Sequence, residues 1–226
     1  MDETIHINIG ASQTDTHYIA SYTVRVWPHL LASVNWILRN PISGNLLIQH
    51  GISITVINNL AIAVEGFIAD IISEYLYKKD HLKAISNIDL DRMTWQNKRK
   101  LYNELFSKRL EAYLLYDGIE TLISFRNNLA HGRTYTEYTM REIAGDEISD
   151  IESGNKVYQD LRTYLIKNRL LKPGNISSNV EVPWKIQIAC HFVGLVKSFM
   201  ENVLRENESD SKLGIETEFK LVYNIA

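Results

Sequence analysis

DGIETLISFRNNLAHG, residues 117–132, predicts a helix with a defined first and last residue. Asp117 suits the N-cap, and Glu120 three residues later completes a capping-box pattern. Gly132 is a natural residue just past a helix end, which places His131 at the C-cap. At about 100° per residue, one apolar stripe runs along this helix: Ile119, Leu122, Ile123, Leu129 and Ala130.

Arg126 is the anomaly in this helix, because it falls near the centre of the apolar stripe. A guanidinium aimed at a core must be paired, hydrated in a cleft or placed at an interface, since an unpaired buried charge is very costly. Arg126 is therefore the first candidate functional residue.

His131 follows Arg126 with four residues between them, and Asn127 comes directly after Arg126. In an unbroken helix, the five-residue offset turns Arg126 and His131 roughly 140° apart, so they do not share a face. Asn127 and His131 are four residues apart and do share one. Either the helix loosens at His131, or a second copy of the chain supplies the missing half of a site. A two-fold dimer is the simplest way to bring two such helix ends together.

The hexapeptide RNNLAH at 126–131 resembles the motif of the HEPN domains (higher eukaryote and prokaryote nucleotide-binding). That motif is Arg-x4-6-His near the end of a core helix, often with Asn after Arg. A second likeness is the apolar helix expected at 58–70, which carries a lone Glu65, as first core helices of the family often do. The resemblance covers about residues 49–132 and a closing helix near 183–206, and it implies a HEPN-like helical bundle.

The resemblance also implies a chemistry. Many catalytic HEPN domains are metal-independent ribonucleases that dimerise through the motif helices and cleave RNA by attack of a 2′-OH on the adjacent phosphate. His131 would then be the general base or acid, and Arg126 would stabilise charge on the phosphoryl oxygens. Asn127 would orient His131 or the phosphate, and Glu65 would hold Arg126. Arg133 stands where one branch of the family carries a modified Tyr, so that modification is not expected here, although Arg133 could contact a phosphate.

Structural alternatives remain open for the same residues. Arg126 could pair with Glu65 as a bridge, His131 could cap a helix end, and Arg133 could be solvated. The protein would then be a non-catalytic nucleotide- or RNA-binding module, or a structural helical dimer. A toxin or phage-defence setting, with an antitoxin protein as a further partner, follows from the family alone.

Length, composition and net charge exclude few of these functions. A length of 226 residues with 45% hydrophobic residues predicts one domain with a real core. The formal charge of −3 argues against a dedicated duplex-binding protein, but a nuclease needs only a local basic cluster. One such cluster, for which a solvated helix face is the alternative, falls on the expected helix at 94–116: Lys98, Arg99, Lys100, Lys108 and Arg109.

The cysteine count, the apolar segments and the known cofactor motifs indicate the cellular compartment and the need for a cofactor. The single cysteine, Cys190, allows no intrachain disulfide, and the first thirty residues lack a continuous apolar signal region, so a cytoplasmic protein is expected. Polar residues interrupt the apolar run at 52–72, which predicts a buried helix and not a membrane span. Phosphate-loop, dinucleotide and zinc-ligand patterns are missing from the sequence, so neither a cofactor nor a metal is expected.

The chain as a whole is expected to form a single mainly α domain over residues 1–226, with its helical core at about 49–206. Residues 1–27 and 215–226 alternate between apolar and polar, so both predict strands at the edge of the bundle that could pair with each other. The segment 134–139 is rich in β-forming residues and an acidic loop is expected at 142–152, together an insertion after the motif helix. The helices are expected at 28–40, 49–78, 94–116, 117–131, 156–171 and 183–206.

Overall fold

The computed structural model describes residues 10–14, 17–21, 25–40, 44–78, 90–130, 138–144, 147–153, 156–170, 186–207 and 212–224. These residues form seven α-helices, two short 3₁₀ helices and two β-hairpins. The described part of the chain is therefore mainly helical, which confirms the predicted fold class at that level.

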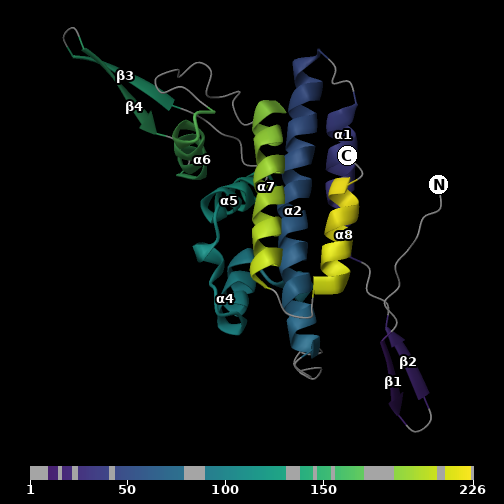
Figure 1. Ribbon diagram of the computed structural model, residues 1–226. Helices are drawn as coiled ribbons and strands as arrows, with labels where there is room; N and C mark the ends of the chain where they lie inside the picture. Colours follow the sequence, from purple (N-terminus) through teal and green to yellow (C-terminus); the bar gives the residue numbers. More distant parts are fainter. Residues whose placement is uncertain are drawn as a thin grey trace.

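Helix α2 (Leu46–Lys78) is the centre of the bundle (Figure 1). It packs against α1 (Trp27–Arg39), α4 (Trp95–Leu105), α5 (Tyr116–Ala130) and α7 (Ile186–Glu206). A helix surrounded in this way must be apolar on most sides, as its sequence is. The apolar side chains that it buries completely are Val56, Ile57, Leu60, Ala61, Ala63, Val64, Phe67, Ile68 and Ile72.

The last helix, α8 (Lys212–Asn224), corrects the prediction of a C-terminal strand at 215–226. Ile215, Phe219 and Val222 are four and three residues apart, and all three are buried, so helical periodicity decides this segment. Helix α8 packs against α1, and α6 (Lys156–Lys167) packs against α5. The helical part of the fold therefore extends beyond the expected limits of 49–206, because α1 and α8 contribute to the same core.

Two antiparallel hairpins complete the described structure. Strands β1 (Gly10–Thr14) and β2 (His17–Ser21) form one, and β3 (Tyr138–Ala144) and β4 (Glu147–Ser153) form the other. They are separate two-stranded sheets, and Figure 1 draws them at opposite ends of the molecule. Most of residues 142–152, expected as an acidic loop, belong to β3 and β4 instead.

The helix expected at 94–116 is broken. Helix α4 ends at Leu105, and the chain continues through the 3₁₀ helix η2 (Leu110–Ala112) before α5 begins at Tyr116. The side-chain oxygen of Asn103 accepts a hydrogen bond from the Leu110 backbone N–H at 2.8 Å, which fixes the chain reversal. Leu115 has a positive φ of 73°, and this left-handed residue lies directly before α5. A preceding 3₁₀ helix, η1 (Leu90–Arg92), leads into α4.

The end of α6 offers a stabilising substitution. Arg169 has a φ of 59°, and its N–H bonds to the Ile166 carbonyl at 2.9 Å, while the Leu170 N–H bonds to the Leu165 carbonyl at 2.9 Å. These two bonds form a Schellman motif, in which the left-handed position favours glycine. Since Arg169 is exposed, Arg169→Gly is expected to raise the free energy of unfolding by about 1 kcal/mol, and the melting temperature by about 2–4 °C. Thermal unfolding beside Arg169→Ala checks this, because alanine keeps the strain and should leave the melting temperature near that of the wild type.

Candidate functional site

Helix α5 carries the predicted motif and is firmly seated in the core. Ile119, Leu122 and Ile123 are buried, as the predicted stripe requires, and so is Phe125. At Gly118, an added Cβ would lie 2.2 Å from Leu195 Cδ1 of α7 and 2.6 Å from the Tyr164 hydroxyl of α6, so a larger residue would have to displace these side chains. The position of the motif helix is therefore set by packing against α2 and α7.

The predicted capping box at the start of α5 is wrong. Asp117 lies in the first turn and its exposed carboxylate is 3.7 Å from Lys167 Nζ. Glu120 turns away from the helix start and accepts hydrogen bonds from side chains of α4 and α5. The helix starts at Tyr116 because the left-handed Leu115 ends the preceding segment there.

Arg126 forms an ion pair with Glu65, a contact that both the catalytic and the structural interpretation of the sequence predict. Nη2 of Arg126 donates to Oε1 of Glu65, so the pair joins α5 to the middle of α2. The two side chains are 18% and 17% exposed, which places the pair at the edge of the core and within reach of solvent. Arg126 is therefore a paired charge that is partly exposed to solvent.

Two buried side-chain atoms, one in this pair and one two helical turns away on α2, lack hydrogen-bond partners among the described residues. Nε of Arg126 is buried without an acceptor, and Oδ1 of Asn58, two helical turns before Glu65 on α2, is buried without a donor. Leaving a buried polar group unpaired costs about 1–3 kcal/mol, so native proteins normally satisfy such groups. The face of α2 and α5 that carries the pair therefore has unused hydrogen-bonding capacity.

The same face of α2 is uncovered toward its N-terminus. Ile48 and Ile62 are 49% and 43% exposed, and an added Cβ at Gly51 would meet nothing within 4 Å. Residues spaced alternately three and four apart lie on one line along a helix and form the seam of a left-handed helix pair. The exposed or half-exposed residues on this line, called the α2 seam below, are Ile48, Gly51, Thr55, Asn58, Ile62 and Glu65.

The other predicted site residues have different environments. Asn127 is exposed on α5, while Asn128 points into the core and is 5% exposed. His131 and Arg133 lie outside the described residues, so the structure brings together Glu65 and Arg126 and leaves the rest of the predicted set untested.

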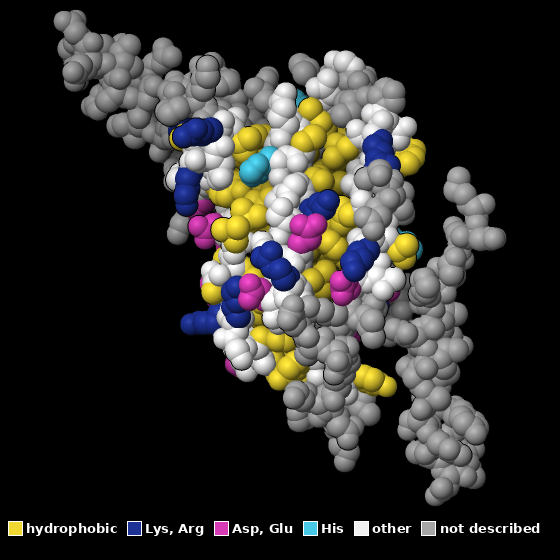
Figure 2. All heavy atoms as spheres, viewed as in Figure 1, with side chains coloured by type: hydrophobic (Ala, Val, Ile, Leu, Met, Phe, Trp, Pro, Cys, Tyr) yellow, Lys and Arg dark blue, Asp and Glu magenta, His cyan; other side chains and the backbone are white. Residues whose placement is uncertain are grey.

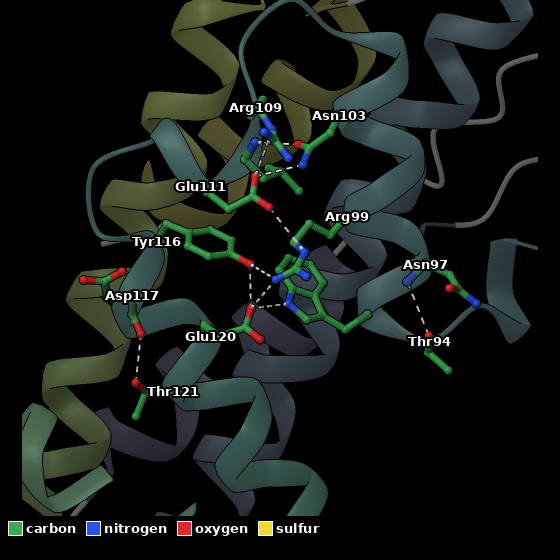
Figure 3. A network of polar contacts seen from close by, with 12 residues as sticks. Thr94, Asn97, Arg99, Asn103, Arg109, Glu111, Tyr116, Asp117, Glu120 and Thr121 are labelled. Atoms are coloured by element: carbon green, nitrogen blue, oxygen red, sulfur yellow. Dashed lines mark hydrogen bonds and ion pairs between the residues drawn. The ribbon is translucent and has the colours of Figure 1, made fainter. Parts of the chain in front are cut away.

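A polar network between α4 and α5 was missed by the sequence reading (Figure 3). Oε2 of Glu120 accepts hydrogen bonds from Trp95 Nε1 at 2.8 Å and from the Tyr116 hydroxyl at 2.6 Å. Nη1 of Arg99 donates to the same hydroxyl at 3.1 Å, and Nε of Arg99 lies 3.4 Å from Glu111. Trp95 and Arg99 are four residues apart, as are Tyr116 and Glu120, so each pair lies on one helix face. That spacing was the available signal.

The five residues of the predicted basic cluster have different environments, and Arg99 belongs to this network. The hydrogen bond with Tyr116 raises the pKa of Arg99, and burial raises the pKa of the Tyr116 phenol, so both keep their protons near neutral pH. Lys98 is buried, while Lys108 lies 3.3 Å from Glu206 and Arg109 lies 3.9 Å from Glu111. The cluster is therefore neither a simple solvated helix face nor a continuous free basic patch.

No protein-family model matches the chain, and neither a curated protein nor a solved structure matches it significantly. Within α2, the segment Ile48–Tyr77 is long and apolar enough to cross a membrane, but 56% of its most apolar window is buried, and the core helix of a soluble protein has the same properties. In the part of the chain that the structure describes, no group of three or more His, Cys, Asp or Glu residues could hold a metal ion.

Proposed function

We propose that the protein is a metal-independent endoribonuclease of HEPN type that cleaves single-stranded RNA. The observation that carries this proposal is Arg126, a guanidinium that is 18% exposed at the edge of the core and is held by Glu65 through Nη2. A planar fork of N–H donors held in this way suits a phosphate, which accepts two hydrogen bonds side by side.

The proposed reaction needs two proton transfers and one site for negative charge. The 2′-oxygen forms a bond to phosphorus while the bond from phosphorus to the 5′-oxygen breaks, which leaves a 2′,3′-cyclic phosphate. His131 carries out one of the two transfers, taking the 2′-proton or giving a proton to the departing 5′-oxygen, because imidazole titrates near neutral pH, and water carries out the other. Arg126 stabilises the charge that develops on the phosphoryl oxygens. Asn127, exposed one residue after Arg126, orients the phosphate or His131, and Arg133 adds a phosphate contact.

The proposed enzyme acts as a homodimer joined along the α2 seam. The seam is apolar at Ile48 and Ile62, has a glycine at position 51 that permits close approach, and ends at the Glu65–Arg126 pair. Packing two copies along such a line buries apolar surface and brings two motif helices toward a common axis. The oxygen of Asn58 would then have a donor available from the second copy.

The resemblance to HEPN domains supports the setting as well as the chemistry. A cytoplasmic toxin or phage-defence effector, restrained by an antitoxin protein, fits the proposed activity. RNA, a second copy of the chain and this antitoxin are the proposed partners.

Cleavage of a mixed single-stranded RNA in excess EDTA tests the proposal. The wild type is expected to leave 2′,3′-cyclic phosphate ends, whereas Arg126→Ala and His131→Ala lower the cleavage rate by at least about 10²-fold, as the loss of a charge-stabilising or proton-transferring group does. Asn97→Ala, an exposed change on α4, is the matched control. Wild-type rates in both motif variants would assign the activity elsewhere and overturn the proposal.

An Ile62→Asp variant extends the same assay to the dimer. Light scattering is expected to show a dimer for the wild type and a monomer for Ile62→Asp, with cleavage falling in parallel. A monomeric wild type that still cleaves RNA would remove the α2 seam from the proposal.

A non-catalytic role is the second candidate, because the Arg126–Glu65 pair closes within one chain and could serve as a bridge between α2 and α5. Intact RNA after incubation with folded wild-type protein, across several substrates, would favour this binding or structural role.

A further inference from the structure

A pocket between α7 and α8 lies on different helices from the Arg126–Glu65 pair and plays no part in the proposed reaction. Its volume is about 350 Å³, at the lower end of the range for small-molecule sites. Leu204 from α7 and Phe219 and Tyr223 from α8 give it an apolar lining, and Leu204 and Phe219 are buried. Figure 2 looks onto this side of the molecule, where acidic and basic side chains alternate over apolar surface.

The charges around the pocket do not cancel. Lys197 lies 4.0 Å from Glu201, and Lys220 lies 2.7 Å from Glu216, so two of the lining cations have carboxylate partners. Arg205, the third, donates at 2.6 Å to the neutral amide of Asn202. Arg205 has no carboxylate within ion-pair distance among the described residues, and the described lining of the pocket holds three cations and two carboxylates, a surplus of one positive charge.

Tyr223 adds an unused hydrogen-bonding group. Its hydroxyl is buried and has no hydrogen-bond partner in the described part of the chain. Burial, with a smaller contribution from the charge of Glu201, raises the pKa of this phenol, so the hydroxyl keeps its proton and can donate. Lys197 Nζ lies 5.0 Å from the Tyr223 ring centroid, which brings a cation to the same residue.

We propose that this pocket binds a small organic anion with an apolar ring and a single negative charge. The ring lies against Leu204 and Phe219, and the anionic group pairs with the guanidinium of Arg205 and accepts a hydrogen bond from the Tyr223 hydroxyl. A monoanion matches the surplus of one charge, while a neutral ring would leave both polar groups unsatisfied. The inference stands independently of the ribonuclease proposal, since it shares no residue with that site.

Titration calorimetry of the full chain with 2-naphthoate, beside the uncharged 2-naphthamide, tests this inference. One saturable site is expected for 2-naphthoate, with at least about tenfold weaker binding of the amide, since one charge-assisted hydrogen bond accounts for a factor of that size. Arg205→Gln is expected to weaken 2-naphthoate about tenfold. Lys100→Gln, which removes an exposed cation on α4, is the matched control and should leave the affinity unchanged.

Tyr223→Phe separates a ligand contact from a structural hydroxyl. Removal of an unpaired buried hydroxyl is expected to preserve or raise the melting temperature, while affinity for 2-naphthoate falls severalfold. Equal binding of the acid and the amide, no saturation at millimolar concentration, or an equal loss in Lys100→Gln and Arg205→Gln would each overturn the proposal.

Discussion

Arg25→Met is expected to lower the free energy of unfolding by about 3–5 kcal/mol, the loss typical for removal of one partner from a buried charge cluster. The Arg25 side chain is 8% exposed and lies directly before α1. Nη1 donates to Glu218 of α8 at 2.8 Å, Nη2 pairs with Glu74, and Nε lies 3.4 Å from Asp70 of α2. One guanidinium thus joins three carboxylates from two helices.

The size of this loss comes from the charges left behind. Without the guanidinium, three carboxylates that are each only about one-fifth exposed lose one ion-pair partner and repel one another, while Trp27 Nε1 still donates to Asp70 at 2.8 Å. Urea unfolding followed by circular dichroism measures the effect, with Arg39→Met on the exposed end of α1 as the control. Adding Glu218→Gln to Arg25→Met should restore part of the stability. A loss below about 1 kcal/mol would show that solvent already screens the cluster.

The long central helix was the most predictable part of the fold. Residues 49–78 contain few charges and many apolar side chains, so any arrangement that buries the chain must surround this helix. The structure extends it only slightly, to Leu46–Lys78. The helices expected at 28–40 and 183–206 also appear, as α1 and α7, because each combines an apolar stripe with a proline near its start or before it.

The predicted strand at 215–226 and the predicted unbroken helix at 94–116 were wrong, because contacts with distant parts of the chain determine both segments. Residues 215–226 alternate well enough to suggest a strand, but Ile215, Phe219 and Val222 also fit a helix, and the ion pair between Glu218 and Arg25 favours that helix. The break after Leu105 is bridged by the hydrogen bond from the Leu110 N–H to Asn103, which connects residues seven apart. Periodicity within a short window carries no information about such a contact.

In the candidate site too, some residues could be identified from the sequence and others could not. Arg126 was suspect because it interrupts an apolar stripe, and Glu65 because it is a lone charge in an apolar helix. Pairing lowers the cost of burying two such charges of opposite sign, and the structure shows that Arg126 and Glu65 form an ion pair. Glu120 gave a misleading signal, because its position also fits a capping box, and only the packing of α4 against the start of α5 brings Trp95 within hydrogen-bonding distance.

If the protein cleaves RNA as proposed, Glu65→Ala is expected to lower the cleavage rate by about 10²-fold, because a catalytic group displaced by about 1 Å loses a factor of that size. It is also expected to lower the free energy of unfolding by about 1–2 kcal/mol, since Arg126 loses its partner at a site that solvent partly screens. Cleavage rates and urea unfolding of Glu65→Ala, Arg126→Ala and the double variant measure both effects. Glu104→Ala, an exposed change on α4, is the control.

The double variant, Glu65→Ala with Arg126→Ala, distinguishes a catalytic role of the ion pair from a purely structural one. If Glu65 acts only by holding Arg126, the double variant should cleave RNA no more slowly than Arg126→Ala alone, because two residues that act as a unit are not additive. Its stability should exceed that of Glu65→Ala, since the unpaired half-buried charge is gone. A bridge without a catalytic role gives the same stability pattern but leaves cleavage per folded molecule unchanged in all three variants. Stability and cleavage together therefore separate a structural ion pair from a positioned catalytic arginine.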